Sequence, residues 1–280
     1  FGMRFCVFAI AAVVALGAAS GCSDSSDGGN DVEVTMGGIA WGFTLPEQGG
    51  YDRIVGARVS VLEIPELTTT TNDQGEFTIE GIPAGSDATF VLEHEDYPLA
   101  QTKTHTVPET DVTDLTFQVP NNELYAGIEI VLGITSDPAK CQMVSTFTRY
   151  GKTIGDAGPH GQAGAVLDVE PPGDASIEDG PVYFNENVLP DRRRSYSSLD
   201  GGVLLLNADP AEYTLRASCV SDPGLMAQFL AEYPPEDEPD DDLRCQTEDV
   251  EFESVRMKCR PGVFVNASPS YGLQAQAPEE

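Results

Sequence analysis

The segment from residue 56 to residue 93 constrains the fold more than any other part of the chain. Apolar residues alternate with polar ones through 57–61 and again through 76–80, which is the period of a β-strand with one buried face. Between these runs lies the sequence Asn-Asp-Gln-Gly, in which Gly75 can adopt a positive φ and Asp73 can bond its own backbone. The segment therefore predicts a sheet of short strands joined by tight turns.

Three motifs in this region carry a resemblance to a known family. They are Gly56–Val61, the turn Thr71–Phe77 and the turn Gly81–Gly85. The region 34–119 resembles the carboxypeptidase regulatory-like domain, and it departs from the family pattern in the long stretch 44–55. The resemblance implies a transthyretin-like β-sandwich that is non-catalytic and that accompanies enzymes, receptors or surface proteins.

The amino terminus has the pattern of an export signal. Arg4 precedes an uncharged, mostly apolar run through 5–19, which matches a signal-peptide core and is short for a membrane span of ~20 residues. Ala19-Ser20-Gly21-Cys22 resembles a bacterial lipobox, although such motifs prefer Leu at the position of Ala19. The resemblance implies that Cys22 is lipidated, with fatty acids such as palmitate. The alternative is an ordinary secretory peptide with a chance cysteine.

The chain is strongly acidic, with 15 Lys and Arg against 46 Asp and Glu and a formal net charge of −31. Proteins that bind nucleic acid concentrate positive charge, so nucleic acid is not an expected partner. Anionic lipid head groups are disfavoured for the same reason. The charge is typical of a soluble, self-repelling surface, and divalent-cation binding by loop carboxylates is the more specific alternative.

The second half of the chain repeats motifs of the first. Gly164–Val169 matches Gly56–Val61 at an offset of 108 residues, and Asp200–Leu205 matches the region that begins at Asp73 at an offset of 127. Two turns and a strand that recur in the same order indicate a duplicated sandwich. The rival explanation is turn chemistry common to all β-proteins. The second half is therefore expected to contain 19 additional residues between these motifs, located within 171–194.

Four cysteines lie in the second half, and an even number in an exported protein predicts two disulfides. Three pairings are possible. We favour Cys219–Cys245, which would close the excursion between them, and Cys141–Cys259, which would tie the first strand of this half to a late one. Zinc is disfavoured because no two of these cysteines have the spacing of a zinc ribbon.

Several residues are candidates for binding. Trp41 is expected in the core, and as the single tryptophan it is also a candidate sugar-stacking platform together with Tyr97. The acidic run 236–242 is expected to be a solvated loop, and its aspartates are weak calcium candidates because EF-hand spacing is absent. These candidates are Asp237, Asp240, Asp241 and Asp242. Arg192-Arg193-Arg194 is expected to be exposed charge, with an anionic glycan or the acidic loop as alternative partners.

Motifs of common catalytic sites are missing from the sequence. It contains neither H-E-x-x-H, G-x-S-x-G nor a P-loop, and its histidines, His94, His105 and His160, are scattered. We expect no enzyme activity and no cofactor. Acid and base pairs of carboxylates keep a hydrolase as a remote alternative, since acidic residues are spread throughout the chain.

The sequence predicts an all-β fold with two tandem transthyretin-like or Ig-like β-sandwich domains joined by a short helix. The expected function is a non-catalytic, lipid-anchored structural or binding module of the bacterial cell envelope at the outer membrane, with the membrane and envelope proteins or glycans as partners. The alternative is a carbohydrate- or calcium-binding surface module. The expected parts are a lipoprotein signal peptide (1–22), a flexible tether (23–31), the regulatory-like sandwich (32–120), a linking helix (121–135), a second sandwich with the disulfides and an acidic insertion (136–272) and a tail (273–280).

Overall fold

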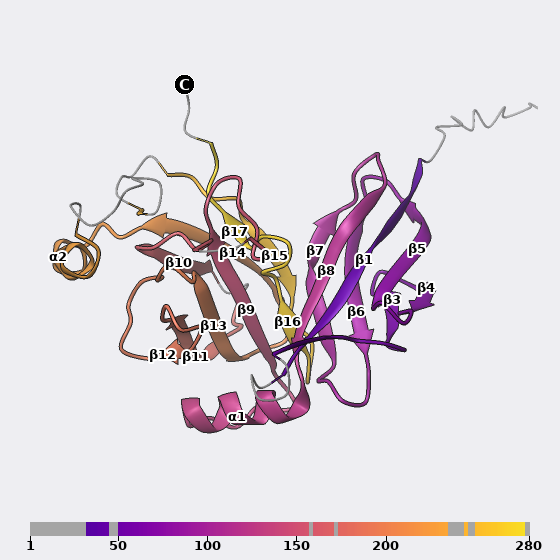
Figure 1. Ribbon diagram of the computed structural model, residues 1–280, viewed down its shortest axis with the longest axis horizontal. Coiled ribbons are helices and arrows are strands. Elements are labelled where there is room, and N and C mark those ends of the chain that lie inside the picture. Colours follow the sequence, from indigo (N-terminus) through magenta and orange to yellow (C-terminus); the bar gives the residue numbers. More distant parts are fainter. Residues whose placement is uncertain are drawn as a thin grey trace, which may run out of the picture. The chain divides into compact units, whose positions relative to one another are not determined.

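The computed structural model describes residues 32–44, 50–156, 159–170, 173–234, 244–245 and 250–277 (Figure 1). Strands dominate these residues, and the helices among them are α1 (Asn122–Leu132) and α2 (Pro223–Glu232). The all-β fold class expected from the period-two alternation is confirmed. Residues 32–280 cluster as one compact unit.

The first half, 32–120, is a sandwich of two sheets. β1 pairs with β2 and β5 on one side and with β8 on the other, and the facing sheet has the order β4-β3-β6-β7. The strands are β1 (Glu33–Phe43), β2 (Tyr51–Arg53), β3 (Arg58–Val61), β4 (Ile64–Thr70), β5 (Glu76–Pro83), β6 (Asp87–Glu93), β7 (Ala100–Thr106) and β8 (Val112–Pro120).

The second half, from 136 onward, is also built of two sheets. One has the order β12-β11-β13-β9-β16, with β17 also on β9, and the other has the order β10-β14-β15. The strands are β9 (Cys141–Thr148), β10 (Ala165–Glu170), β11 (Ile177–Phe184), β12 (Pro190–Asp191), β13 (Gly202–Ala208), β14 (Glu212–Cys219), β15 (Val255–Lys258), β16 (Phe264–Asn266) and β17 (Leu273–Gln274).

The two halves repeat the same pairing pattern. β1 is antiparallel to β5 and parallel to β8, and β9 is likewise antiparallel to β13 and parallel to β16. In the facing sheets, β3-β6-β7 and β10-β14-β15 are both antiparallel throughout. This is the arrangement that a duplicated sandwich requires. The hairpin β11–β12 lies within 171–194, where the sequence locates the extra length of the second half.

Each half has its own apolar interior. The first contains Phe77, Phe90 and Phe117, together with the aliphatic residues of β3, β5 and β6. The second contains Phe147 and Tyr213 between β9, β13, β14 and β15. The first interior also includes Phe264, which comes from β16 near the end of the chain. One side chain of the second half therefore completes the core of the first.

β16 joins the halves into one sheet. It pairs in parallel with β9 at Gln142–Val144 and with β7 at Ala100–Thr102, so that a ten-stranded sheet runs through both halves (Figure 1). The sequence analysis expects a tail from 273 onward, but residues 273 and 274 form β17. Ala267 and Leu273 are fully buried in the second core, because β17 pairs with β9 and turns these side chains inward.

α1 follows β8 within one residue and lies within the expected linking helix, 121–135. Its N-cap is Asn121, whose side chain accepts the hydrogen bond from Leu124 N at 2.8 Å. Gly133 ends the helix with φ 67°, the left-handed conformation that glycine adopts without a steric penalty. Leu132 packs on Val182, Leu204 and Leu206.

One local expectation, on the turn after β4, needs correction. In the turn after β4 the side chain that organises the backbone is Asn72, not Asp73, because Asn72 Oδ1 accepts hydrogen bonds from Gln74 N and Glu76 N, both at 2.9 Å. In α2, Phe229 is buried, whereas Leu230 is exposed. Asp222 caps α2 and Pro223 occupies its first position, which is where proline is tolerated.

Candidate functional site

The sequence candidates for lipidation and for calcium cannot be located. Cys22, the tether 23–31 and the aspartates Asp237, Asp240, Asp241 and Asp242 all lie outside the described residues. Among the residues that are described, no group of three or more His, Cys, Asp or Glu side chains is placed to hold a metal ion. Neither α1 nor α2, the helices in this part of the chain, has the length and apolar character needed to cross a bilayer.

Trp41 is on the outer face of β1, and its expected place in the core is wrong. The core side of this stretch of β1 carries small residues, Ala40 and Gly42, because Tyr97 fills the space above them. A Cβ at Gly42 would lie 2.1 Å from the Tyr97 hydroxyl. The Trp41 ring is therefore turned outward, and the guanidinium of its cross-strand neighbour Arg53 lies 3.4 Å from its centroid.

The outer face of β1 and β2 is aromatic. Phe43 and Tyr51 are cross-strand partners with ring centroids 4.9 Å apart, and Tyr51 is 64% exposed. Tyr97 is not part of this face, because it is partly buried against the core side of β1, where burial raises its pKa. The two aromatic candidates from the sequence thus lie on opposite sides of one strand. Tyr51 and Phe43, which the sequence analysis did not single out, accompany Trp41 instead.

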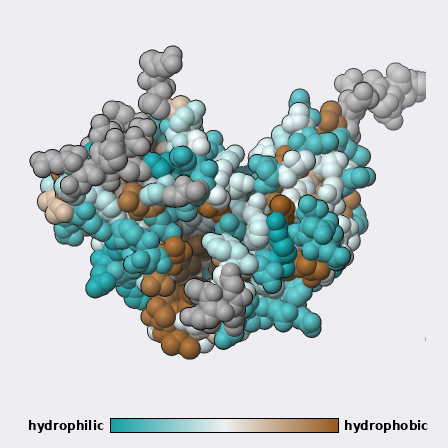
Figure 2. Space-filling model, in the orientation of Figure 1, coloured by the Kyte–Doolittle hydropathy of each residue, from teal (hydrophilic) through white to brown (hydrophobic). Residues whose placement is uncertain are grey.

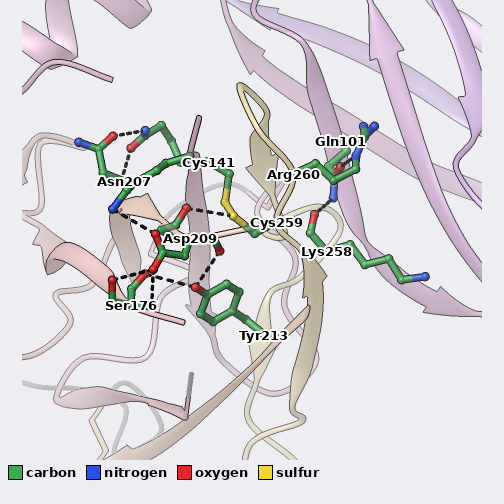
Figure 3. Close-up of a disulfide and its surroundings, with 12 residues drawn as sticks. Gln101, Cys141, Ser176, Asn207, Asp209, Tyr213, Lys258, Cys259 and Arg260 are labelled. Carbon is green, nitrogen blue, oxygen red and sulfur yellow. Dashed lines mark hydrogen bonds and ion pairs between the residues drawn. A yellow bond between two sulfur atoms is a disulfide. The ribbon is translucent and has the colours of Figure 1, made fainter. Parts of the chain in front are cut away.

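The structure contains two disulfides, paired as the sequence analysis favours. Cys141, the first residue of β9, is bonded to Cys259, just after β15 and 118 residues away (Figure 3). Cys259 is surrounded by the second core, with its Sγ 3.3 Å from Ala208 O. Cys219 at the end of β14 is bonded to Cys245, which closes the excursion that contains α2.

Charged side chains from the two halves meet where β15 lies beside β6 and β7. Arg256 donates two hydrogen bonds to the Asp87 carboxylate, at 2.6 and 2.8 Å, and one to Thr106 Oγ1. Lys258 Nζ lies 2.6 Å from Glu63 Oε1, and that carboxylate also accepts hydrogen bonds from Thr89. We call these four charged residues the junction ion pairs. They attach β15 of the second half to the first half.

The buried amide of Gln101 extends this contact. Its Nε2 donates to Lys258 O, and its Oε1 accepts from Arg260 Nε at 2.9 Å (Figure 3). Each polar atom of the Gln101 side chain is therefore bonded to the other half. The sequence analysis missed these residues. The sequence did contain a signal for this contact. Val255–Lys258 alternates, which places Arg256 and Lys258 on one face of a strand, and basic residues are few in this chain.

Lys103 is a further contact between the halves. Its Nζ donates to Tyr271 O at 2.7 Å and lies 4.8 Å from the centroid of the Tyr271 ring. Burial lowers the pKa of Lys103 to about 8, and the negative charge of Glu253 partly opposes this change. Two residues of the second half also hydrogen-bond to β8. Asn266 Nδ2 donates to Gln118 O, and Ser270 Oγ donates to Asp114 O.

The arginine triplet is not free positive charge. Arg192 pairs with Asp179 and donates to Leu132 O at the end of α1, and Arg193 pairs with Asp191. Arg194 is largely buried and pairs with Glu232 of α2 at 2.7 Å. Each guanidinium is neutralised by a carboxylate within the second half. Arg192 and Arg193 are exposed as expected, whereas the expectation is wrong for Arg194. Because all three guanidinium groups are already paired, the alternative of an anionic glycan loses its electrostatic basis.

The histidines do not form a catalytic group. His94 lies in the loop after β6 beside Tyr97, with ring centroids 5.4 Å apart. The Nε2 atom of His105 is buried without a hydrogen-bond partner, and the ring packs edge-on against Phe90. Burial, assisted by the charge of Lys103, lowers the pKa of His105 to about 3, so that the imidazole is neutral at physiological pH.

Exposed aliphatic residues lie on the linking helix α1 and on the β11–β12 turn of the second half. Ile130 and Val131 on α1 are 81% and 69% exposed, and Val188 and Leu189 project from the β11–β12 turn. Figure 2 shows hydrophobic surface at the position of α1. Val188 has φ 60°, which is strained for a β-branched residue. Such exposed aliphatic groups are candidates for contact with another molecule.

An open groove of about 800 Å³ lies on the second half beside β14. Its walls include Arg216, Ser218 and Ser221 on one side and Glu251 and Glu253 on the other. Arg216 is exposed and 3.5 Å from Glu170, and nothing in this lining resembles a nucleophile activated by a neighbouring base. The groove shows no arrangement that defines a chemical reaction.

Comparisons with known proteins do not assign the chain to a family. No family model matches it, and no curated protein sequence matches it. It is similar to the Bacillus anthracis TIE protein at 11% identity and a TM-score of 0.25, covering 87% of this chain and 34% of that one. It is similar to the shaft pilin SpaA from Lactobacillus rhamnosus GG at 12% identity and a TM-score of 0.24, covering 89% and 98%. It is similar to GBS52, the minor pilin of Streptococcus agalactiae, at 10% identity and a TM-score of 0.26, covering 88% and 98%. At these values the similarities define no function.

Proposed function

We propose that this protein is a non-catalytic, lipid-anchored protein of the bacterial cell envelope that acts as a structural module. The observation that carries the proposal is the continuous sheet through β16, which fixes the two sandwiches to each other. An enzyme built from two halves commonly leaves a pocket between them for its substrate. Here the space is filled by a shared strand, by Phe264 and by ion pairs.

The charges at the junction support a structural role. Asp87, Glu63, Arg256 and Lys258 are the ionisable groups that face each other there, and each is bonded to a residue of the other half. Groups that are satisfied in this way are not available to bind or transform a substrate. Two disulfides in the second half fit an exported protein, because such bonds persist in oxidising compartments.

The proposed attachment is through lipid on Cys22, followed by the tether 23–31. Ser23 after the cysteine is compatible with the outer membrane. The tether lacks large apolar residues and contains two adjacent glycines, so it would behave as a flexible spacer before β1 begins at Glu33. Stable anchoring needs more than one acyl chain, which a lipidated cysteine would carry.

The anchor is tested by metabolic labelling with a fatty-acid analogue. We expect the native protein and Cys6→Ala to incorporate the label and to fractionate with membranes, because Cys6 would be removed with the signal peptide. Cys22→Ala should lose the label and leave the membrane fraction. Equal labelling of Cys22→Ala and Cys6→Ala would contradict the lipid anchor.

A carbohydrate-binding face is the second candidate, and the aromatic outer surface of β1 and β2 favours it. Tyr51 is the accessible ring, whereas the Arg53 guanidinium covers one face of Trp41. Tyr51→Ala should abolish binding on a glycan array if this face stacks on sugars. Tyr150→Ala is the matched control, because Tyr150 is exposed to nearly the same extent, 62%, in the other half. Equal signals from the two variants would exclude the face.

A further inference from the structure

The first and last strands of the first half are parallel partners. β1 pairs with β8 from Met36–Val112 to Phe43–Pro120, and both strands run in the same direction. The chain therefore enters this half at one end of the β1–β8 pair and leaves it at the opposite end. The two strands approach each other very closely at Gly38, where an added Cβ would lie 1.6 Å from Leu115 O.

This geometry determines how the half responds to tension along the chain. Force applied at Val32 pulls β1 toward its N-terminal end. Force applied after Pro120 pulls β8 toward its C-terminal end, which is the opposite direction because the two strands are parallel. The strands must then slide past each other, and the hydrogen bonds between them are strained together. When a strand is instead peeled from its end, the bonds break one at a time, each with a net contribution of only ~1 kcal/mol.

In the second half a disulfide shortens the path of tension. A pull on the C-terminal segment detaches β17 and β16 and reaches Cys259, where the covalent bond transfers it directly to Cys141 at the start of β9. The chain between these cysteines, including the Cys219–Cys245 loop, is outside the path. From Cys141 the tension returns through α1 to the end of β8.

We propose that this protein transmits tension between its N-terminal end and its second half, with β1–β8 as a shear clamp and Cys141–Cys259 as a bypass. The inference rests on the proposed structural role in the envelope. It requires neither a particular lipid nor a particular partner. Equal lipid labelling of Cys22→Ala and Cys6→Ala would therefore refute the anchor alone, while equal rupture forces in the mechanical measurements below would refute the clamp alone.

Single-molecule force spectroscopy on the full chain tests the clamp without changing the fold. One handle is attached ahead of Val32, and the second is attached either at Ala126, beyond the end of β8, or at Glu109, before its start. Both second positions are exposed. The first geometry shears β1 against β8, and the second peels them apart. We expect a several-fold higher rupture force for shear at the same pulling speed, whereas equal forces would overturn the proposal.

Two adjacent glycines provide matched variants. Gly38→Ala would clash with Leu115 O of β8, whereas Gly37→Ala would place its Cβ 2.5 Å from Phe77 O of β5. Gly38→Ala should lower the shear force more than Gly37→Ala does. If either variant fails to fold, the comparison of pulling geometries in the native chain still decides the question. A shear force lowered equally by both variants would count against the β1–β8 pair as the resisting element.

The bypass is tested with handles ahead of Val32 and after Ala277. Under oxidising conditions the final extension should exclude the chain between Cys141 and Cys259. Reduction should add its length, which is about 420 Å for a separation of 118 residues at ~3.6 Å per residue. An extension that does not change on reduction would show that this disulfide lies outside the path of tension.

Discussion

Arg256 on β15 holds Asp87 on β6 through two parallel hydrogen bonds, although the residues are 169 positions apart in the chain. The hydrogen bonds from Arg256 are the main cause of the lowered pKa of Asp87, and the charge of the arginine adds to them. Planar, two-point pairing of this kind fixes orientation as well as distance. The pair therefore positions β15 against the first half.

A double-mutant cycle measures this pair. We expect Arg256→Ala and Asp87→Ala to show a coupling free energy of about 1 kcal/mol at neutral pH, the upper end for partly exposed pairs. Because the pKa of Asp87 is lowered in the folded state, the contribution is present above the ordinary aspartate pKa and is lost as the pH falls through the lowered value. Denaturant unfolding of the four proteins of the cycle, at neutral pH and at a pH below the lowered pKa of Asp87, measures the loss of coupling. The same cycle on Arg58 and Glu93, an exposed pair within the first half, should give less coupling.

The two disulfides should differ in their effect on stability. Loop-closure entropy predicts about 4.9 kcal/mol for Cys141–Cys259, with a separation of 118, and about 3.5 kcal/mol for Cys219–Cys245, with a separation of 26. Replacing each pair with alanine and measuring the free energy of unfolding tests this order. A larger loss from removal of Cys219–Cys245 would show that strain or residual structure outweighs chain entropy.

Trp41 reports its own environment, since it is the single tryptophan of the chain. Arg53→Ala should expose the indole ring and shift its emission to longer wavelength, and the loss of the cation–π contact should cost ~0.5–1 kcal/mol. Fluorescence of the folded protein measures the first effect and denaturant unfolding the second. A control, Arg58→Ala, should leave the emission unchanged. Blue emission that does not respond to Arg53→Ala would place Trp41 in the core.

His105 should make the protein sensitive to mild acid. Its pKa is about 3 in the folded state and near 6.5 when unfolded, so the unfolded state takes up the proton first as the pH falls. Stability is therefore lost between pH ~6.5 and the folded pKa, by up to ~1.4 kcal/mol per pH unit. His105→Phe removes this loss. Unfolding free energies of both proteins across this range test the prediction, and parallel pH profiles would contradict it.

Val188 is strained and exposed at the β11–β12 turn. Val188→Asn should increase the free energy of unfolding by about 1 kcal/mol, because asparagine tolerates the left-handed conformation that valine disfavours. Val131→Asn on α1 is the control, since Val131 is also exposed but its substitution relieves no such strain. If thermal unfolding shows Val131→Asn to be more stable than Val188→Asn, strain at the turn is excluded.

Local features of the fold were predictable from the sequence. The alternation at 57–61 and 76–80 corresponds to β3 and β5, and the turn between them has Gly75 at φ 71°. The linking helix expected at 121–135 contains α1, which begins one residue later and ends three residues earlier. These features depend on neighbouring residues, which share one local geometry, so a linear pattern is enough to identify them.

Features that depend on distant partners were not predictable. Alternation in β1 shows that Trp41 and Ala40 face opposite ways, but only Tyr97 decides which of the two faces is buried. The pairing of β16 with β7 leaves no trace in the sequence of Phe264–Asn266, since a three-residue strand is too short to show a period. The sequence likewise gives no sign that Asp179, Asp191 and Glu232 are the partners of Arg192, Arg193 and Arg194.

The shared strand β16 also has a consequence for biosynthesis. Residues 100–106 are synthesised well before residues 264–266, so this edge of β7 remains unpaired while most of the second half is still being synthesised. During that interval the first half also lacks Phe264. The nascent chain must therefore avoid self-association through β7 until residues 264–266 have been made, and truncations before residue 264 should aggregate rather than yield a soluble single sandwich.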